Sequence, residues 1–239
     1  MFMLCTIQTI MKWNQLYNYP KSLRSNVNGK RHYDVGDTKM PSVTTILSVT
    51  ATDEKKESLA RWRAKVGAAE ADRITNAATK RGGQMHEYLE AFLKSQLNLD
   101  LLGHNTRERM MADVIIENGL KDQLSEIWGV EAVMYNPKLL YAGACDLVGI
   151  WNQKSCILDF KSSTNLKQKN WITDFFLQGA AYVMAHNEVY QTNISQVAIL
   201  ICTKDNLFQK FTVEGEELKH YEKEFSNRVE QYYELKKQG

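Results

Sequence analysis

The sequence predicts an α/β protein of the α+β kind, in which a mixed β-sheet core is flanked by helices. Helical periodicity fills much of the first half of the chain, and short apolar strands with one helical stretch among them dominate the second half. The 44% hydrophobic and 24% charged residues are those of a globular protein with a sizeable core. At 239 residues, one catalytic-sized domain with an N-terminal β-ribbon and a helical region accounts for the length.

The charge balance and the cysteines exclude several classes of protein. Thirty Lys and Arg against 28 Asp and Glu give a net charge of +2, so no global field points to a partner. The four cysteines form no C-x-x-C pair, which argues against a zinc knuckle and against a secreted disulfide framework. They are Cys5, Cys145, Cys156 and Cys202. We therefore expect a reducing, intracellular compartment, with the last three cysteines buried in strands.

No membrane-spanning helix is predicted. The longest purely apolar runs are as short as residues 197–202, whereas a span needs about 20 apolar residues. Residues 1–11 lack a charged start and a small-residue cleavage site, so we expect no secretory signal there.

Turn residues predict a β-ribbon within residues 1–40. Asn28-Gly29 is a two-residue hairpin signal, and the next six residues, 30–35, read as a short strand that ends at the Gly36-Asp37 turn. Ser42 then precedes residues 43–47, where it would cap a short helix, although the β-branched residues there also suit a strand. We place the start of the main domain, residues 41–239, at this point.

The stretch from residue 53 to about residue 97 has helical spacing. Apolar residues recur there at intervals of three and four, and we expect Gly82-Gly83 to separate two helices. A further helix is expected over residues 107–117. The helical region thus covers residues 53–120 of the main domain.

The second half of the chain alternates strands with helices. We expect strands over residues 130–135, 144–151, 156–161 and 196–202, a crossover helix over 174–185 and a terminal helix over 216–236. The crossover helix between the last two strands predicts a mixed sheet with helices on its faces.

Acidic and basic residues interrupt two of these apolar strands. A period of two places Asp159 and Lys161 on the same face of their strand, and the hairpin loop at residues 152–154 brings Asp146 opposite Asp159. Two carboxylates at one place bind a hard cation such as Mg²⁺, and the lysine would orient a water molecule or offset charge on a phosphate. The alternative is an exposed ion pair of Asp159 and Lys161, worth at most about 1 kcal/mol.

Three motifs give this pattern a family resemblance. Gly143-x-x-Asp146, the hairpin and Asp159-x-Lys161-Ser-Ser resemble the signature of the PD-(D/E)XK nuclease superfamily, and Asp159 follows Asp146 by 13 residues, as is typical of its RecB-like exonuclease branch. Residues 82–86 are similar to the Gly-x-x-x-His motif of that branch, and residues 178–182 are similar to its Gln-x-x-x-Tyr motif. Taken singly, a helical His is more often structural and a helical Tyr is more often core.

Within that branch, residues 41–47 and the strand of Glu131 resemble mitochondrial genome maintenance exonucleases and their bacteriophage relatives. The resemblance implies a restriction-endonuclease-like fold and an Mg²⁺-dependent DNA exonuclease, with Mn²⁺ as a substitute, acting on single strands or free ends in replication, recombination or repair. A salt-bridged edge glutamate is the alternative for Glu131.

The resemblance also implies a set of site residues. Its catalytic residues would be Asp146, Asp159, Lys161 and Glu131. The metal would be held by His86, Asp146, Asp159 and Phe160. The DNA-binding residues would be Gln178, Tyr182, Ser162 and Arg81. No iron-sulfur cluster is expected, because members of the branch that hold one have three cysteines after the Gln-x-x-x-Tyr helix, and here only Cys202 follows it.

Charge segregation agrees with a DNA partner. Residues 55–81 hold eight basic residues against three acidic ones, although a solvated helix face explains them as well. Trp171, which follows Lys167 and Lys169, would stack a base or pack on the sheet. We expect no membrane partner, and the location would be the cytoplasm of a bacterial host for a viral protein or the mitochondrion for a eukaryotic one.

Other functions lose their usual sequence support. No phosphate-binding loop, nucleophile elbow or dinucleotide-binding turn occurs, and a zinc-protease motif that begins at His86 fails because Glu90 stands where the second His is required. The remaining rivals are a structure- or site-specific endonuclease of the same fold and an inactive DNA-binding relative.

Overall fold

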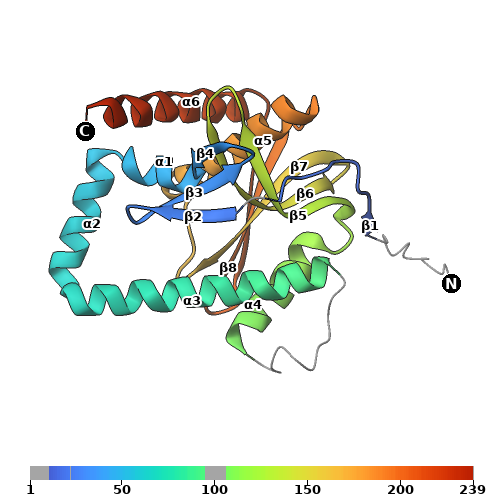
Figure 1. Ribbon diagram of the computed structural model, residues 1–239. Coiled ribbons are helices and arrows are strands. Elements are labelled where there is room, and N and C mark those ends of the chain that lie inside the picture. Colours follow the sequence, from blue (N-terminus) through green and yellow to red (C-terminus); the bar gives the residue numbers. More distant parts are fainter. Residues whose placement is uncertain (1–10, 22, 95–105, 239) are drawn as a thin grey trace.

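A computed structural model describes residues 11–21, 23–94 and 106–238. Its centre is a six-stranded mixed sheet in the order β1-β5-β6-β7-β8-β9, flanked by helices as the sequence predicts (Figure 1). Three long strands form an antiparallel meander: β5 (Leu124–Asn136), β6 (Tyr141–Trp151) and β7 (Lys154–Ser163). The outer strands are β8 (Gln196–Thr203), parallel to β7, then β9 (Phe208–Glu214), antiparallel to β8, and β1 (Lys12–Trp13), parallel to β5.

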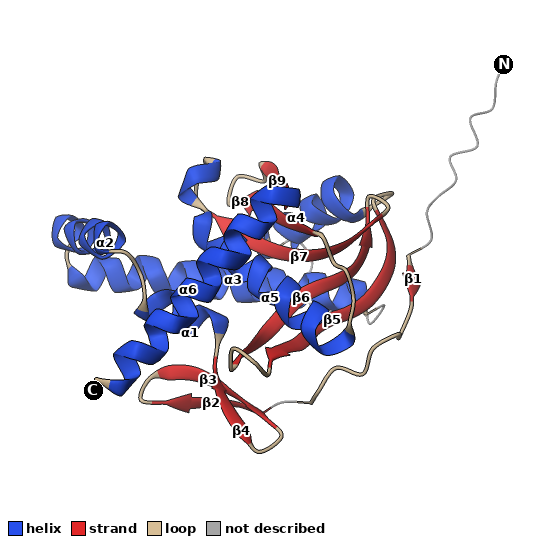
Figure 2. Cartoon of the chain, turned by 90° about the horizontal axis from the view of Figure 1, so that it is seen from above, coloured by secondary structure: helices blue, strands red, loops and turns tan. Residues whose placement is uncertain are grey.

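The N-terminal ribbon is a separate three-stranded antiparallel sheet. It contains β2 (Leu23–Val27), β3 (Lys30–Val35) and β4 (Thr38–Pro41). Asn28 and Gly29 both have positive φ, 52° and 76°, which is the geometry that an Asn-Gly hairpin turn requires. The ribbon packs on the central sheet through Tyr33 and Met40, which contact Ala142 of β6. Figure 2 shows the ribbon beside the ends of β5 and β6.

A helical region follows the ribbon. Helix α1 (Val43–Val49) begins at Ser42, whose Oγ accepts the Thr45 N–H at 3.0 Å, so the expected helix and its cap are confirmed. The helical region continues with α2 (Asp53–Val66), α3 (Ala68–Leu93) and α4 (Arg107–Ile115), the last extended by a π-helical turn (Ile116–Leu120).

The predicted break at Gly82-Gly83 is wrong. Both glycines lie inside the continuous helix α3, and the chain turns instead at Gly67, whose φ of 86° and ψ of 150° suit glycine alone. A Cβ on Gly82 would lie 3.3 Å from Ser162 Oγ, so this glycine lets α3 approach β7 closely. The end of the predicted helical stretch, residues 95–97, lies outside the described residues, as do Cys5 and residues 1–10 of the segment tested for a secretory signal.

Helices α5 (Thr173–Tyr190) and α6 (Gly215–Lys237) cover the face of the sheet opposite to α3 and α4. Helix α5 follows a 3-10 turn (Lys169–Trp171) and crosses from β7 to β8, and α6 ends the fold. One apolar core lies between the sheet and α1, α5 and α6, and a second lies between the sheet and helices α3 and α4. Strand β9 was not expected from the sequence, and the four strands predicted in the second half of the chain are each longer than expected.

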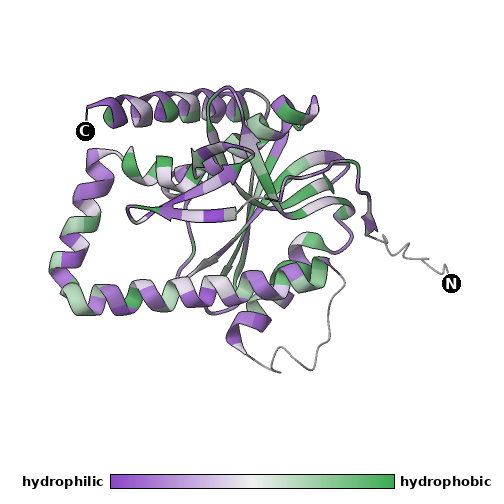
Figure 3. Cartoon of the chain, in the orientation of Figure 1, coloured by the Kyte–Doolittle hydropathy of each residue, from purple (hydrophilic) through white to green (hydrophobic). Residues whose placement is uncertain are grey.

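Hydropathy follows these layers. The central strands carry long apolar stretches, whereas β2 and β3 are largely polar (Figure 3). Cys145, Cys156 and Cys202 are buried and unpaired, as predicted. In the described part of the chain, no helix is both long enough and apolar enough to cross a membrane.

Candidate metal centre

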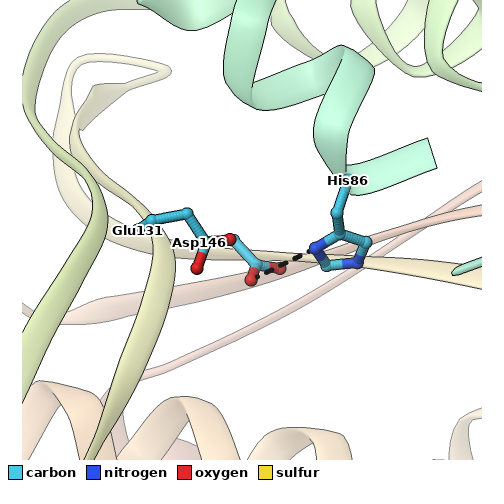
Figure 4. Close-up of side chains that lie close together, drawn as sticks. All are labelled: His86, Glu131 and Asp146. Atoms are coloured by element: carbon cyan, nitrogen blue, oxygen red, sulfur yellow. Dashed lines mark ion pairs between the residues drawn. The ribbon is translucent and has the colours of Figure 1, made fainter. Parts of the chain in front are cut away.

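Three side chains from separate elements meet at one point. The potential ligand atoms of His86 on α3, Glu131 on β5 and Asp146 on β6 all lie within 4.8 Å of one another. Figure 4 shows the imidazole of His86 and the carboxyl group of Asp146 directed toward each other. An imidazole nitrogen with two carboxylate groups is a donor set that fits a divalent cation with water in the remaining positions. This cluster is a possible metal site.

The β6–β7 hairpin places Asp146 beside Asp159. The ladder pairs Leu147 with Leu158, and just beyond that pair the Asp146 Oδ2 accepts the backbone N–H of Phe160 at 2.7 Å. Burial acts to raise the pKa of Asp146, but the charge of His86 and its hydrogen bond outweigh burial and hold that pKa below its ordinary value. Asp146 therefore stays ionised.

Glu131 lies opposite Asp146 in an unusual backbone conformation. The ladder pairs Val130 with Leu147 and Ala132 with Cys145, which leaves Glu131 facing Asp146 between them. Its φ of 51° is left-handed, and a residue held there costs on the order of 1–3 kcal/mol. Burial, followed by the charge of Asp146, raises the pKa of Glu131 to about 7. Among the described residues Glu131 has no ion-pair partner, so the salt-bridged alternative is wrong.

His86 contacts both strands of the hairpin. Its Nε2 lies 2.8 Å from the carbonyl oxygen of Phe160, and its Nδ1 lies 3.4 Å from Asp146 Oδ1. Burial lowers the pKa of His86, but the Asp146 carboxylate outweighs burial and raises it to about 9. With this pKa, His86 is protonated on both ring nitrogens at neutral pH, with Nε2 facing the Phe160 carbonyl and Nδ1 facing Asp146. A cation that binds the imidazole would have to displace a proton.

Asp159 and Lys161 form a buried ion pair. Lys161 Nζ lies 2.5 Å from Asp159 Oδ2, and the Asp159 side chain is 1% exposed. Burial raises the pKa of Asp159 to about 6 against the lowering effect of Lys161. Burial lowers the pKa of Lys161, but the carboxylates of Asp159 and Asp146 outweigh it and raise that pKa. The alternative of an exposed surface pair is wrong.

Helix α5 closes the site from the side of Lys161. Gln178 Oε1 accepts from Lys161 Nζ at 3.4 Å, and Gln178 Nε2 donates to the Tyr182 hydroxyl at 3.3 Å, so the two residues share the predicted face. Tyr182 also belongs to the apolar core. A Cβ on Gly143 would lie 2.8 Å from the Tyr182 hydroxyl oxygen, so glycine is required for this approach.

Ser162 and Arg81 lie where α3 passes the end of β7. The Ser162 Oγ faces Gly82, and Arg81 donates from Nη2 to Thr164 Oγ1 at 3.5 Å. The Nε of Arg81 is buried without a hydrogen-bond partner.

Most of the side chains described above line a cleft of about 500 Å³. Its walls include His86, Glu131, Asp146, Lys161, Gln178 and Tyr182. They also include Arg24 and Arg31 of the ribbon, which sequence analysis did not single out. The period-two alternation of side chains along β2 and β3 places both arginines on one face of the ribbon, but it does not show that the ribbon folds over the site.

Two sequence expectations about the surface are refined. Of the eight basic residues in 55–81, five form ion pairs: Lys55 with Asp174, Lys56 with Asp53, Arg61 with Glu57, Arg63 with Asp72 and Arg73 with Glu70. Most of that stretch is thus a salt-bridged helix surface. Trp171 is 63% exposed, so it does not pack on the sheet.

Comparisons with known proteins find relatives of the chain by sequence. No protein-family model matches the chain. A protein named mitochondrial genome maintenance exonuclease 1 from Xenopus tropicalis is 32% identical over 181 residues, which are 70% of this chain and 49% of that protein. The chain is related in sequence to exonucleases.

Relatives of the same name in two mammals support this relationship. The human protein is 28% identical over 208 residues, 83% of this chain and 59% of its own length, and the mouse protein is 29% identical over 201 residues, 74% and 56%. The chain spans about half the length of the curated relatives it matches.

Proposed function

We propose that this protein is a divalent-metal-dependent DNA exonuclease of the RecB-like branch of the PD-(D/E)XK nucleases, which hydrolyses phosphodiester bonds in single-stranded or end-containing DNA during replication, recombination or repair. The observation that carries the proposal is the meeting of His86, Glu131 and Asp146 beside the buried pair of Asp159 and Lys161. The sequence relationship to exonucleases supports it.

The metal ligands we propose are His86, Asp146, Asp159 and the carbonyl oxygen of Phe160, with Mg²⁺ as the cation and Mn²⁺ as a substitute. The donor chemistry fits, and Asp159 Oδ1 is a buried oxygen without a hydrogen-bond partner, as expected of an atom that awaits a ligand. When bound, the cation would polarise a phosphoryl oxygen and lower the pKa of a water molecule. Glu131 would add a third carboxylate to the catalytic set.

Lys161 would supply positive charge at the reacting phosphate. Because its pKa is raised, Lys161 stays protonated and acts as a donor, not as a base. Gln178 accepts a hydrogen bond from the ammonium group and is itself hydrogen-bonded to Tyr182. Ser162 and Arg81 would extend the surface that contacts the DNA backbone. These roles need few contacts to bases, so we expect little sequence preference.

The same residues could serve an endonuclease, and the substrate test separates the two. Linear single strands, linear duplexes and covalently closed circles are incubated with Mg²⁺, with Mn²⁺ and with EDTA. We expect linear DNA to be degraded with either metal, circles to survive, and EDTA to stop the reaction. Cleavage of circles would establish the endonuclease, and undiminished cutting in EDTA would remove the metal from the proposal.

A pair of variants controls for contaminating nucleases. Asp146→Ala should abolish cleavage while DNA binding remains, because phosphate contacts elsewhere supply most of the affinity. Asp205→Ala removes an exposed carboxylate from the loop after β8 and should cleave like the parent protein. Equal activity of both variants would contradict the assignment of Asp146.

We also propose the organisation and location that go with this activity. Residues 41–239 would form the nuclease domain, with the helical region 53–120 inside it, and residues 1–40 would form an extension and the ribbon. The protein would work inside the cell, in a mitochondrion if its source is eukaryotic or in a bacterial host if its source is a virus.

A further inference from the structure

The candidate cleft has two chemically different walls. One wall carries the carboxyl groups of Glu131 and Asp146 with His86. The other wall belongs to the ribbon and carries Arg24 of β2 and Arg31 of β3. A nucleic-acid strand lying between the walls would have the candidate metal centre on one side and the two arginines of the ribbon on the other.

The strand register sends both arginines to the same face of the ribbon. Arg24 pairs with Tyr33, and Arg31 lies two residues before Tyr33 on β3. Cross-strand partners share a face, as do residues two apart on one strand, so Arg24, Arg31 and Tyr33 project together. Lys30 and Lys39 belong to the opposite face, because Lys30 is next to Arg31 and Lys39 pairs with Asp34.

The arginine-bearing face is fixed relative to the metal centre. Tyr33 is 5% exposed and contacts Ala142 on β6, the strand that carries Asp146. The carbonyl oxygen of Arg31 accepts from the Ser42 N–H at 3.0 Å and from the Thr45 hydroxyl at 2.9 Å. The backbone at Arg31 is thereby tied to the start of α1.

Among the residues that the structure describes, neither Arg24 nor Arg31 forms an ion pair or a side-chain hydrogen bond. The arginines of the helical region differ, since Arg61, Arg63 and Arg73 each bind a carboxylate. An arginine that lines a cleft with all its donors open is suited to bind an anion, and its planar fork matches a phosphate group.

We propose that Arg24 and Arg31 bind backbone phosphates of the nucleic-acid strand near the phosphate that is cleaved, and so hold the strand against the metal centre. This inference rests on the proposed nuclease function and assigns its substrate-positioning wall. The contacts are to phosphates, so they would be independent of base sequence.

Salt dependence of binding tests the proposal directly. A fluorescent oligothymidylate and a labelled oligonucleotide of mixed sequence are titrated with protein in Ca²⁺ over a series of KCl concentrations, and binding is read by anisotropy. Each phosphate contact to a single strand contributes about 0.7 to the slope of log K against log salt, so Arg24→Ala/Arg31→Ala should reduce the slope by about 1.4. The loss of affinity should be the same for both oligonucleotides.

The matched control removes two charges from the other face of the same ribbon. Lys30→Ala/Lys39→Ala should keep the slope of the parent protein. An unchanged slope in the arginine variant, an equal change in the lysine control, or a loss that depends on base sequence would overturn the inference.

Cleavage assays on the parent protein distinguish a failure of the proposed phosphate contacts from a failure of the proposed nuclease function. If the parent degrades linear DNA while the arginine variant keeps its slope, only the phosphate contacts are refuted. A parent that neither binds nor cleaves DNA refutes both proposals. Arg24→Gln/Arg31→Gln, with a melting temperature from circular dichroism, replaces the alanine variant should the latter fail to fold.

Discussion

Lys161→Met tests whether the buried carboxylate of Asp159 depends on its lysine. The Asp159 side chain is 1% exposed, its ion pair with Lys161 spans 2.5 Å, and its Oδ1 has no hydrogen-bond donor. Methionine keeps much of the hydrocarbon length of the lysine, so the variant mainly removes charge. Breaking a buried pair by removing one partner costs about 3–5 kcal/mol, because the remaining charge is left without compensation.

The loss of stability in Lys161→Met should depend on pH, because it depends on whether Asp159 is ionised. Burial already raises the pKa of Asp159 to about 6, and loss of Lys161 would raise it further. A folded pKa above the unfolded value, about 3.9, means that the folded protein keeps a proton that the unfolded chain releases. The stability linked to that proton is present below the unfolded pKa and is lost as pH rises through the folded pKa.

Urea unfolding in EDTA, followed by tryptophan fluorescence, measures the effect. We expect Lys161→Met to lose about 3–5 kcal/mol at about pH 8 and less than half of that at about pH 5. The double variant Asp159→Asn/Lys161→Met should recover most of the loss, because no carboxylate is left to ionise. If the single and double variants unfold at the same urea concentration at the higher pH, Lys161 does not compensate Asp159 and the argument is refuted.

Three further predictions concern single positions. Gly143→Ala should displace the Tyr182 hydroxyl, destabilise the protein by about 1–3 kcal/mol in urea unfolding and reduce DNA digestion, and unchanged values for both would contradict the contact. Burial lowers the pKa of His186 to about 4, so stability should fall by on the order of 3 kcal/mol as pH decreases from about 6.5 to about 4. His186→Gln should remove that pH dependence, and a parallel profile would exclude His186 as its source. Ser42→Ala should cost about 1 kcal/mol through loss of the cap on the Thr45 N–H, measured by thermal unfolding against the parent protein.

Sequence reasoning succeeded where local geometry determines the outcome. The period of two along β7 is enough to place Asp159 and Lys161 on one face, and a short hairpin is enough to bring Asp146 beside them. In the same way, helical spacing aligns Gln178 with Tyr182. These relations involve residues close in sequence or joined by a tight turn, so backbone geometry alone specifies them.

The glycine pair in α3 shows why the helix break was placed wrongly. Propensity treats Gly82 and Gly83 as breakers, yet a helix tolerates glycine where packing compensates for the loss. Close approach to Ser162 gives Gly82 a reason to lie inside the helix, and this contact joins residues that are 80 positions apart. Gly67 separates α2 from α3 because its φ and ψ lie in a region that residues other than glycine rarely adopt. Composition alone does not reveal this conformation.

Other parts of the site depend on tertiary structure alone. No local signal in the strand predicts that Glu131 adopts a left-handed backbone conformation opposite Asp146. Arg24 and Arg31 reach the cleft only because the ribbon folds back over β6, more than 100 residues later in the chain. Strand β9 was missed since its outer position leaves most of its side chains partly exposed, which weakens the apolar signal.

The ribbon buries little apolar surface of its own, and this sets how the cleft behaves over time. Its apolar contact with the rest of the molecule centres on Tyr33 and Met40 against Ala142, and the Arg31 carbonyl adds two hydrogen bonds to the start of α1. The central strands, in contrast, are covered by helices on both faces. Native proteins open segment by segment, and the segments with fewest buried contacts open at the lowest free energy. We therefore expect amide hydrogens of β2 and β3 to exchange sooner than those of β7 and β8. Such openings would be brief departures from the native contacts of Tyr33 and Arg31, and during them a polymer would be able to enter the cleft from the side while the carboxylates stay in place.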